Sequence, residues 1–241
     1  MRRFLAPAVL TACALLLSSC WKTAEVPSVP GQQSASASSR SNPALSFEQV
    51  KKLADSGDNR AQFELGAMYH DGDGVAKDRK KALEWYRTAA DGGNRQAQFN
   101  LGLMYKNGEG VPANLETARK WFIKASDAGD VRASFQLGLL SYQGTGVIKD
   151  MTKALQYFTK AAMGGLAEAQ VNVGVMHLRA EGVIQDVIEG YAWLLIAKDN
   201  GSARAAGMLK DLAEKLTVEQ EKQGKELAAK LKAEMKATET R

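Results

Sequence analysis

Small and apolar residues recur along the middle of the chain with two superimposed periods. Within one stretch, Ala61, Leu65 and Met68 follow the three- and four-residue spacing of a single helix face. The stretch itself returns every 36 residues, as five equivalent alanines show: Ala61, Ala97, Ala133, Ala169 and Ala205. A fixed period of this length predicts a solenoid, because each unit can bury its apolar face only against its neighbours.

Each unit carries the signals of two helices joined by a turn. In the first unit, residues 71–74 (Asp-Gly-Asp-Gly) end one helix, since glycine tolerates the left-handed conformation of helix ends. Asp78 is a good N-cap for the second helix, because its side chain accepts hydrogen bonds from free amides. The residues that take the place of Asp78 in later units are Asn114, Asp150 and Asp186. Gly93 ends the second helix, and its later equivalents are Gly129, Gly165 and Gly201.

A glycine also lies inside the first helix of every unit, at Gly66, Gly102, Gly138 and Gly174. Glycine costs about 1 kcal/mol relative to alanine inside a helix, so we expect the second helix to approach closely at this point. The small residues expected to face these glycines are Ala82, Ala118, Ala154 and Gly190. Four aromatic residues of the second helix share the period and are interpreted as core residues: Trp85, Trp121, Tyr157 and Trp193.

Both ends of the repeat region carry helix-capping signals. Ser46 with Gln49, and Thr217 with Gln220, form capping boxes. A fifth first helix is predicted from Ser202 to Leu216, and a charged terminal helix to about Ala237 shields the apolar end of the stack. The predicted all-α fold has about eleven helices. Its parts are a capping helix at 45–60, repeats at 61–96, 97–132, 133–168 and 169–204, and C-terminal capping helices at 205–241.

The repeated motif resembles a known family. Its pattern, Ala-x3-Leu-Gly-x2-Tyr-x2-Gly-x-Gly-Val-x2-Asp-x3-Ala-x2-Trp-x3-Ala-Ala-x2-Gly, is similar to the Sel-one-like repeat (SLR), a relative of the 34-residue tetratricopeptide repeat. The resemblance implies a right-handed α–α solenoid of about four 36-residue helix-turn-helix repeats with capping helices. Ser141 and His177 depart from the tyrosine and Ala180 from the first loop glycine, so the third and fourth units are expected to pack less regularly.

The N-terminus resembles a bacterial lipoprotein signal. Arg2 and Arg3 precede an apolar stretch too short for a good membrane span, and residues 17–20 read Leu-Ser-Ser-Cys, like a lipobox. The resemblance implies cleavage before Cys20 and acylation of its thiol, with residues 1–20 as signal peptide. Residues 21–44 are rich in Ser, Pro and Gln and are predicted to be a flexible tether. Trp21, where enteric retention signals have aspartate, favours the outer membrane in a Gram-negative cell.

Composition excludes several function classes. The net charge is +5, with lysines and carboxylates interspersed, so nucleic-acid binding is not predicted. Cys13 leaves with the signal and Cys20 carries lipid, so the mature chain has no disulfide. No catalytic group of residues, metal site or cofactor is predicted: His177 is expected in the core, His70 near the exposed end of its helix, and residues 71–74 are interpreted as a turn.

The remaining candidate for function is the inner wall of the solenoid. In related helical solenoids the first helix of each unit lines a concave surface, and its outward residues here are rich in amides, which suit an extended peptide backbone. The predicted partner-binding residues are Gln62, Glu64, Gln98, Asn100, Gln136, Gln170 and Asn172.

These observations predict an extracytoplasmic, lipid-anchored adaptor, at the outer membrane facing the periplasm if the cell is Gram-negative. It would bind a protein or peptide partner and serve in envelope or secretion-complex assembly. One alternative is a lipoprotein associated with exopolysaccharide or peptidoglycan, for which Tyr142 is the main aromatic outside the repeat core. Another is a lactam-binding or lactam-hydrolysing enzyme, as has been linked to disulfide-rich relatives whose paired cysteines this chain lacks.

Overall fold

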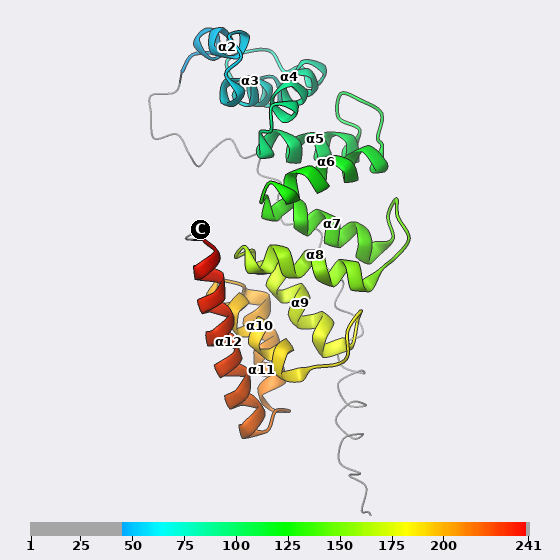
Figure 1. The fold of residues 1–241 in the computed structure, drawn as a ribbon, viewed down its shortest axis with the longest axis vertical. Coiled ribbons are helices and arrows are strands. Elements are labelled where there is room, and N and C mark those ends of the chain that lie inside the picture. Colours follow the sequence, from blue (N-terminus) through cyan, green and yellow to red (C-terminus); the bar gives the residue numbers. More distant parts are fainter. Residues whose placement is uncertain (1–44, 240–241) are drawn as a thin grey trace, which may run out of the picture.

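The computed structural model describes residues 45–239, and every regular element in this range is an α-helix. Figure 1 shows the helices stacked in successive antiparallel pairs along the long axis. Eleven helices are described: α2 (Phe47–Asp55), α3 (Asn59–Asp71), α4 (Arg79–Asp91), α5 (Arg95–Asn107), α6 (Leu115–Asp127), α7 (Val131–Gln143), α8 (Met151–Met163), α9 (Ala167–Arg179), α10 (Val187–Asp199), α11 (Ala203–Ala213) and α12 (Val218–Glu239). The predicted all-α solenoid is confirmed. The signal peptide, the tether and Cys20 lie outside the described residues.

Four helix pairs form the repeats, namely α3/α4, α5/α6, α7/α8 and α9/α10. We call the first helix of each pair helix A and the second helix B. Every helix B begins at the predicted capping residue: the side chains of Asp78, Asn114, Asp150 and Asp186 accept backbone amide hydrogen bonds. The left-handed residue after helix A is Gly72, Gly108 or Gly144 in the first three units. In the fourth unit Ala180 adopts this left-handed conformation, with φ of 57°, so the turn is kept without glycine.

An aromatic ring, and not the predicted alanine, fills the space over the helix A glycines of the first three units. A Cβ atom at Gly66 would lie 2.7 Å from the Tyr86 ring, and one at Gly102 would lie 2.4 Å from the Phe122 ring. Gly138 meets Phe158 in the same way, with 2.6 Å. In the fourth unit the predicted pairing of small residues holds, because a Cβ at Gly174 would lie 3.0 Å from the Gly190 carbonyl oxygen.

In the first three units, the periodic aromatic residue of helix B lies at the edge of the core. Trp85, Trp121 and Tyr157 are partly buried and pack against the main cluster, whereas the next residue in each helix B is fully or almost fully buried. Only in the fourth unit of the described chain is this aromatic in the core, as Trp193 is 2% exposed. The prediction of a core position is therefore correct for Trp193 and too strong for the other three.

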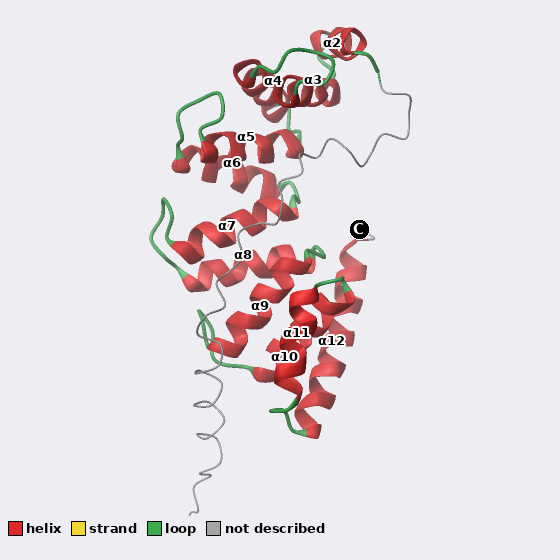
Figure 2. Cartoon of the chain, turned by 180° about the vertical axis from the view of Figure 1, so that it is seen from behind, coloured by secondary structure: helices red, strands yellow, loops and turns green. Residues whose placement is uncertain are grey.

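Helices α2, α11 and α12 complete the stack. The capping box at Ser46 opens α2, which packs on α3 as a lone helix B. Helix α11 begins after Ser202, as predicted, and ends at Ala213. The capping box at Thr217 opens α12, which packs along α10 rather than pairing with α11 (Figure 1 and Figure 2). Helix α11 therefore ends the series of first helices, and the predicted shielding by the terminal helix α12 applies to the side of α10.

Candidate interaction surface

Five of the seven predicted partner-binding residues are buried. We expected all seven to face away from the core, and for these five that expectation is wrong. Their exposed fractions are Gln62 8%, Gln98 7%, Gln136 3%, Gln170 0% and Asn172 3%.

Three of these glutamines instead join successive units. The Nε2 atoms of Gln98 and Gln170 donate to the carbonyl oxygens of Ala90 and Ala162, at 3.2 Å and 3.0 Å. Gln62 Nε2 reaches the Ala54 carbonyl in the same way, at 3.4 Å. Each acceptor lies in the last turn of the preceding helix B and also accepts from the backbone amide of the glycine that follows, so the glutamine supplies its second hydrogen bond. The amides therefore satisfy helix ends and are not free to meet a ligand.

The other two predicted residues, Glu64 and Asn100, are partly exposed. Glu64 Oε1 accepts from Arg60 Nε at 3.1 Å on the same helix. Asn100 is hydrogen-bonded to the buried Tyr86 hydroxyl, and burial raises the pKa of that hydroxyl despite this contact. Asn172, two units later, has a buried Nδ2 without a hydrogen-bond partner. The residue equivalent to Tyr86 at that junction is Phe158, which has no hydroxyl.

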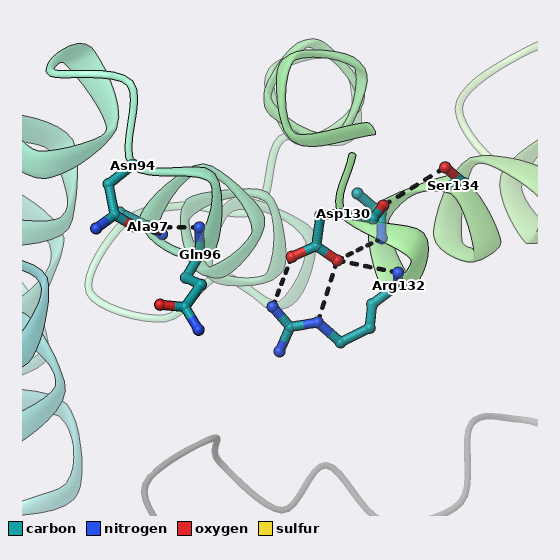
Figure 3. A network of polar contacts seen from close by, with 7 residues as sticks. Asn94, Gln96, Ala97, Asp130, Arg132 and Ser134 are labelled. Carbon is teal, nitrogen blue, oxygen red and sulfur yellow. Dashed lines mark hydrogen bonds and ion pairs between the residues drawn. The ribbon is translucent and has the colours of Figure 1, made fainter. Parts of the chain in front are cut away.

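The junction between the second and third units differs from the others. Ser126 and Ser134 hydroxyls, 2.8 Å apart, stand in place of the glutamine-to-carbonyl bond. Asp130, the N-cap of α7, accepts from the backbone amide of Arg132 at 2.9 Å and from its guanidinium Nη2 and Nε at 2.6 Å and 3.1 Å (Figure 3). The equivalent cap one unit earlier, Asn94, accepts backbone hydrogen bonds from Gln96 and Ala97.

Arg132 is held in place from two sides. Its guanidinium carbon lies 4.3 Å from the centroid of the Phe99 ring on α5, while Asp130 binds the edge described above. Cation–π contact and a bidentate carboxylate both restrict the rotamers of the side chain. Because 37% of the Arg132 side chain is still exposed, it offers a pre-organised donor edge to solvent.

Lys106 on α5 also contacts the third unit across this junction. From the last turn of α5, its Nζ donates to Gln136 Oε1 on α7 at 2.8 Å. Burial lowers the pKa of Lys106, because a desolvated ammonium is less stable. No carboxylate of the described residues lies within ion-pair distance of it.

We name this surface the α5–α7 strip, formed by Phe99, Leu103, Lys106, Arg132 and Gln136. Phe99, Leu103 and Lys106 share one face of α5, and Arg132 and Gln136 are one turn apart on α7. The accessible groups are two cations and the partly exposed Leu103 side chain. Neither cation was among the predicted residues, because both occupy positions that vary between units. The absence of Asp and Glu from the sequences of α5 and α7 is the signal that could have found them.

The two histidines serve the packing. His177 is 6% exposed, as predicted for a core residue. His70 links the first two units, with Nδ1 2.8 Å from Asp71 Oδ1 and Nε2 3.0 Å from Glu109 Oε2. In the described part of the chain, no three or more His, Cys, Asp or Glu side chains gather where they could hold a metal ion. None of the helices in that part has both the length and the apolar character needed to span a bilayer.

Comparison with known families identifies the repeat. The Sel1 repeat model matches residues 59–94, 95–130, 131–166 and 167–202. These matches begin two residues before the repeats predicted from the alanines, at the first residue of each helix A. Sel1-repeat proteins generally mediate protein–protein interactions.

Solved structures and a curated protein share the repeat. A protective antigen of uropathogenic Escherichia coli with an SLR fold is 31% identical, with a TM-score of 0.70, over 81% of this chain and 41% of that one. A Sel1 repeat protein from Oxalobacter formigenes is 34% identical, with a TM-score of 0.65, over 69% and 48%. The secretory immunoglobulin A-binding protein EsiB of Escherichia coli O6:H1 is 42% identical over 45 residues, which are 19% of this chain and 9% of EsiB. This chain thus matches less than half the length of each of these relatives.

Proposed function

The chain belongs to the Sel1 repeat family, and from this premise we propose that it is an extracytoplasmic, membrane-anchored adaptor that holds other proteins at the cell envelope. The observation that carries the proposal is the α5–α7 strip, where a pre-organised arginine, a lysine without a carboxylate partner among the described residues and an apolar side chain are accessible together. Arginine is one of the residues enriched in the hot spots of protein interfaces. No active-site chemistry is needed for this role.

The anchoring half of the proposal is supported by the Leu-Ser-Ser-Cys run at residues 17–20. A diacylated or triacylated Cys20 holds a protein at a membrane durably, since more than one acyl chain is attached. The segment from Trp21 to Ala44 would separate the solenoid from the lipid surface. In a Gram-negative cell we place the protein at the outer membrane facing the periplasm, in the assembly of an envelope or secretion complex.

Photo-crosslinking in the native cell tests the adaptor role. A photoreactive amino acid replaces Leu103 in the strip or, as matched control, the exposed Gln156 on the outer side of α8. We expect discrete protein adducts from position 103 and none of the same mass from position 156. The adaptor assignment fails if position 103 gives no adduct or the same adducts as position 156.

Mass spectrometry of the mature N-terminus tests the anchor separately. We expect an acylated Cys20 as the first residue and recovery of the chain with membranes. A mature chain with an unmodified N-terminus would remove the anchor and leave the adaptor proposal to the crosslinking result.

A further inference from the structure

The charges of the helix A layer are unevenly distributed. Helices α5 and α7 carry Arg95, Lys106 and Arg132 but neither Asp nor Glu in their sequences. By contrast, α3 contains Glu64 and Asp71, and α9 contains Glu168. The one carboxylate that borders the α5–α7 strip at the start of α7, Asp130, is 6% exposed and already binds Arg132. The strip is therefore the part of this layer where cations are accessible without a competing exposed carboxylate.

The hydrogen-bonding capacity of the two cations is only partly used. A guanidinium has five N–H donors and an ammonium has three. In Arg132, Nε and Nη2 donate to Asp130, and in Lys106 one donor goes to the neutral Gln136 oxygen. The remaining donors are available to a ligand in place of water, and the ammonium has no carboxylate partner among the described residues although it is partly desolvated. A ligand with carboxylates would supply acceptors for these donors and an anion for the ammonium.

The accessible Leu103 side chain distinguishes a peptide from a simple anion. Leu103 lies between Phe99 and Lys106 on one face of α5, so an apolar surface separates the two cations along the strip. An extended peptide presents successive side chains on alternate sides and exposes main-chain carbonyls throughout. It can therefore place a carboxylate at each cation and an apolar residue on Leu103.

Resting on the proposed adaptor function, we infer that the α5–α7 strip binds an acidic, extended segment of the partner protein. Carboxylates pair with Lys106 and with the open edge of Arg132, and an apolar side chain of the segment covers Leu103. Charge-assisted hydrogen bonds to two oriented cations give the specificity. The interaction is weakened by salt, because the cations are partly exposed.

Fluorescence anisotropy with defined peptides tests this inference on the full-length lipidated chain in detergent. The probes are two fluorescein-labelled peptides. The Glu-Leu peptide, Ser-Glu-Ser-Leu-Ser-Glu-Ser, carries its Glu and Leu side chains on one face when extended, and the Gln-Leu peptide has Gln in place of both Glu. We expect the Glu-Leu peptide to bind about tenfold more tightly than the Gln-Leu peptide, as for a charge-assisted contact. Lys106→Gln should reduce that difference to the part that Arg132 supplies, while keeping a donor for Gln136. Lys120→Gln, an equal charge change at an exposed position on α6, is the control and should preserve it.

Three results would overturn the inference. They are equal binding of the two peptides, equal effects of Lys106→Gln and Lys120→Gln, and displacement of the peptide by an equimolar amount of inorganic phosphate, which would indicate a simple anion site. Arg132→Gln is a second variant, but it leaves the buried Asp130 without its cation, so its folding is checked by circular dichroism. If position 103 crosslinks a protein in cells while the peptides bind equally, the adaptor role stands and the acidic partner is wrong. If no adduct forms, the adaptor role itself fails.

Discussion

Gly102→Ala tests the packing on which every repeat depends. The added methyl carbon would lie 2.4 Å and 2.5 Å from two carbons of the Phe122 ring, closer than real Cβ contacts. Phe122 is 0% exposed, so its ring has no room to withdraw. Overpacking of this kind costs about 1–3 kcal/mol, and the better helix propensity of alanine returns about 1 kcal/mol. Because the ring is enclosed, we place the cost at the upper end and expect a net loss of about 1–2 kcal/mol.

Thermal and urea unfolding, followed by circular dichroism, measure this change. The matched control is Gly207→Ala, because Gly207 is exposed within α11 and a Cβ there meets nothing within 4 Å. The same chemical change should then stabilise the protein by about 1 kcal/mol. For a chain of this size 1 kcal/mol corresponds to a Tm shift of about 2–4 °C. The two variants should therefore move the Tm in opposite directions.

A double-mutant cycle assigns the loss to the ring. Phe122→Leu removes the clashing ring edge, so Gly102→Ala should cost less in the Phe122→Leu background than in the parent. Should Gly102→Ala raise the Tm as Gly207→Ala does, or cost the same in both backgrounds, close packing would not be the reason for glycine at this position.

Two further predictions concern polar contacts between units. Phe158→Tyr should supply a hydroxyl acceptor for the buried Asn172 amide and raise the free energy of unfolding by about 1 kcal/mol in thermal melts. The control is Phe122→Tyr, which should gain less because the equivalent amide residue, Gln136, already accepts a hydrogen bond from Lys106. Equal gains from the two variants would contradict the assignment. Burial alone would raise the pKa of Glu109, but hydrogen bonds from Asn107 and His70 outweigh it and lower the pKa. A lowered carboxyl pKa stabilises the fold above about pH 4.3, and this contribution is lost as the pH falls. Glu109→Gln should thus flatten the fall in stability between about pH 5 and pH 3, and an unchanged acid limb would refute this role.

Helix boundaries were predictable because their causes are local. Asp78 and its equivalents accept amide hydrogen bonds within three residues of their own position, and the left-handed glycines end the preceding turn. The 36-residue period then predicted the order of the helices, because each unit has the same neighbours. No tertiary information is required for either step.

The roles of the buried glutamines depend on contacts between helices, which the 36-residue period does not reveal. Gln98 and Gln170 carry the polarity of a surface residue, yet their acceptors lie at the end of another helix. The adjacent aromatics Trp121 and Phe122 recur with the same period, and only the rotation of helix B places Phe122 against Gly102. The predictions of exposed glutamines and of core aromatics in the first three units were both wrong for the same reason. Neighbouring positions on one helix face different helices, and the period alone does not show which helix each position faces.

The end of the solenoid follows from substitutions at the positions that receive helix B. In α11, Lys210 stands where the earlier units have the glycine that admits an aromatic ring, so a further helix B cannot pack closely there. At the same time α10 is apolar on its outer face: Ala192 replaces Glu84, Lys120 and Gln156 of the earlier units. Helix α12 meets this face with Ala228 and Met235, which share a buried cluster with Trp193, and Lys232 pairs with Asp199. The substitution in α11 prevents a further helix B from packing there, and the substitution in α10 provides the apolar surface on which α12 packs. The residues of α10 and α11 therefore account for the end of the repeats after the fourth unit.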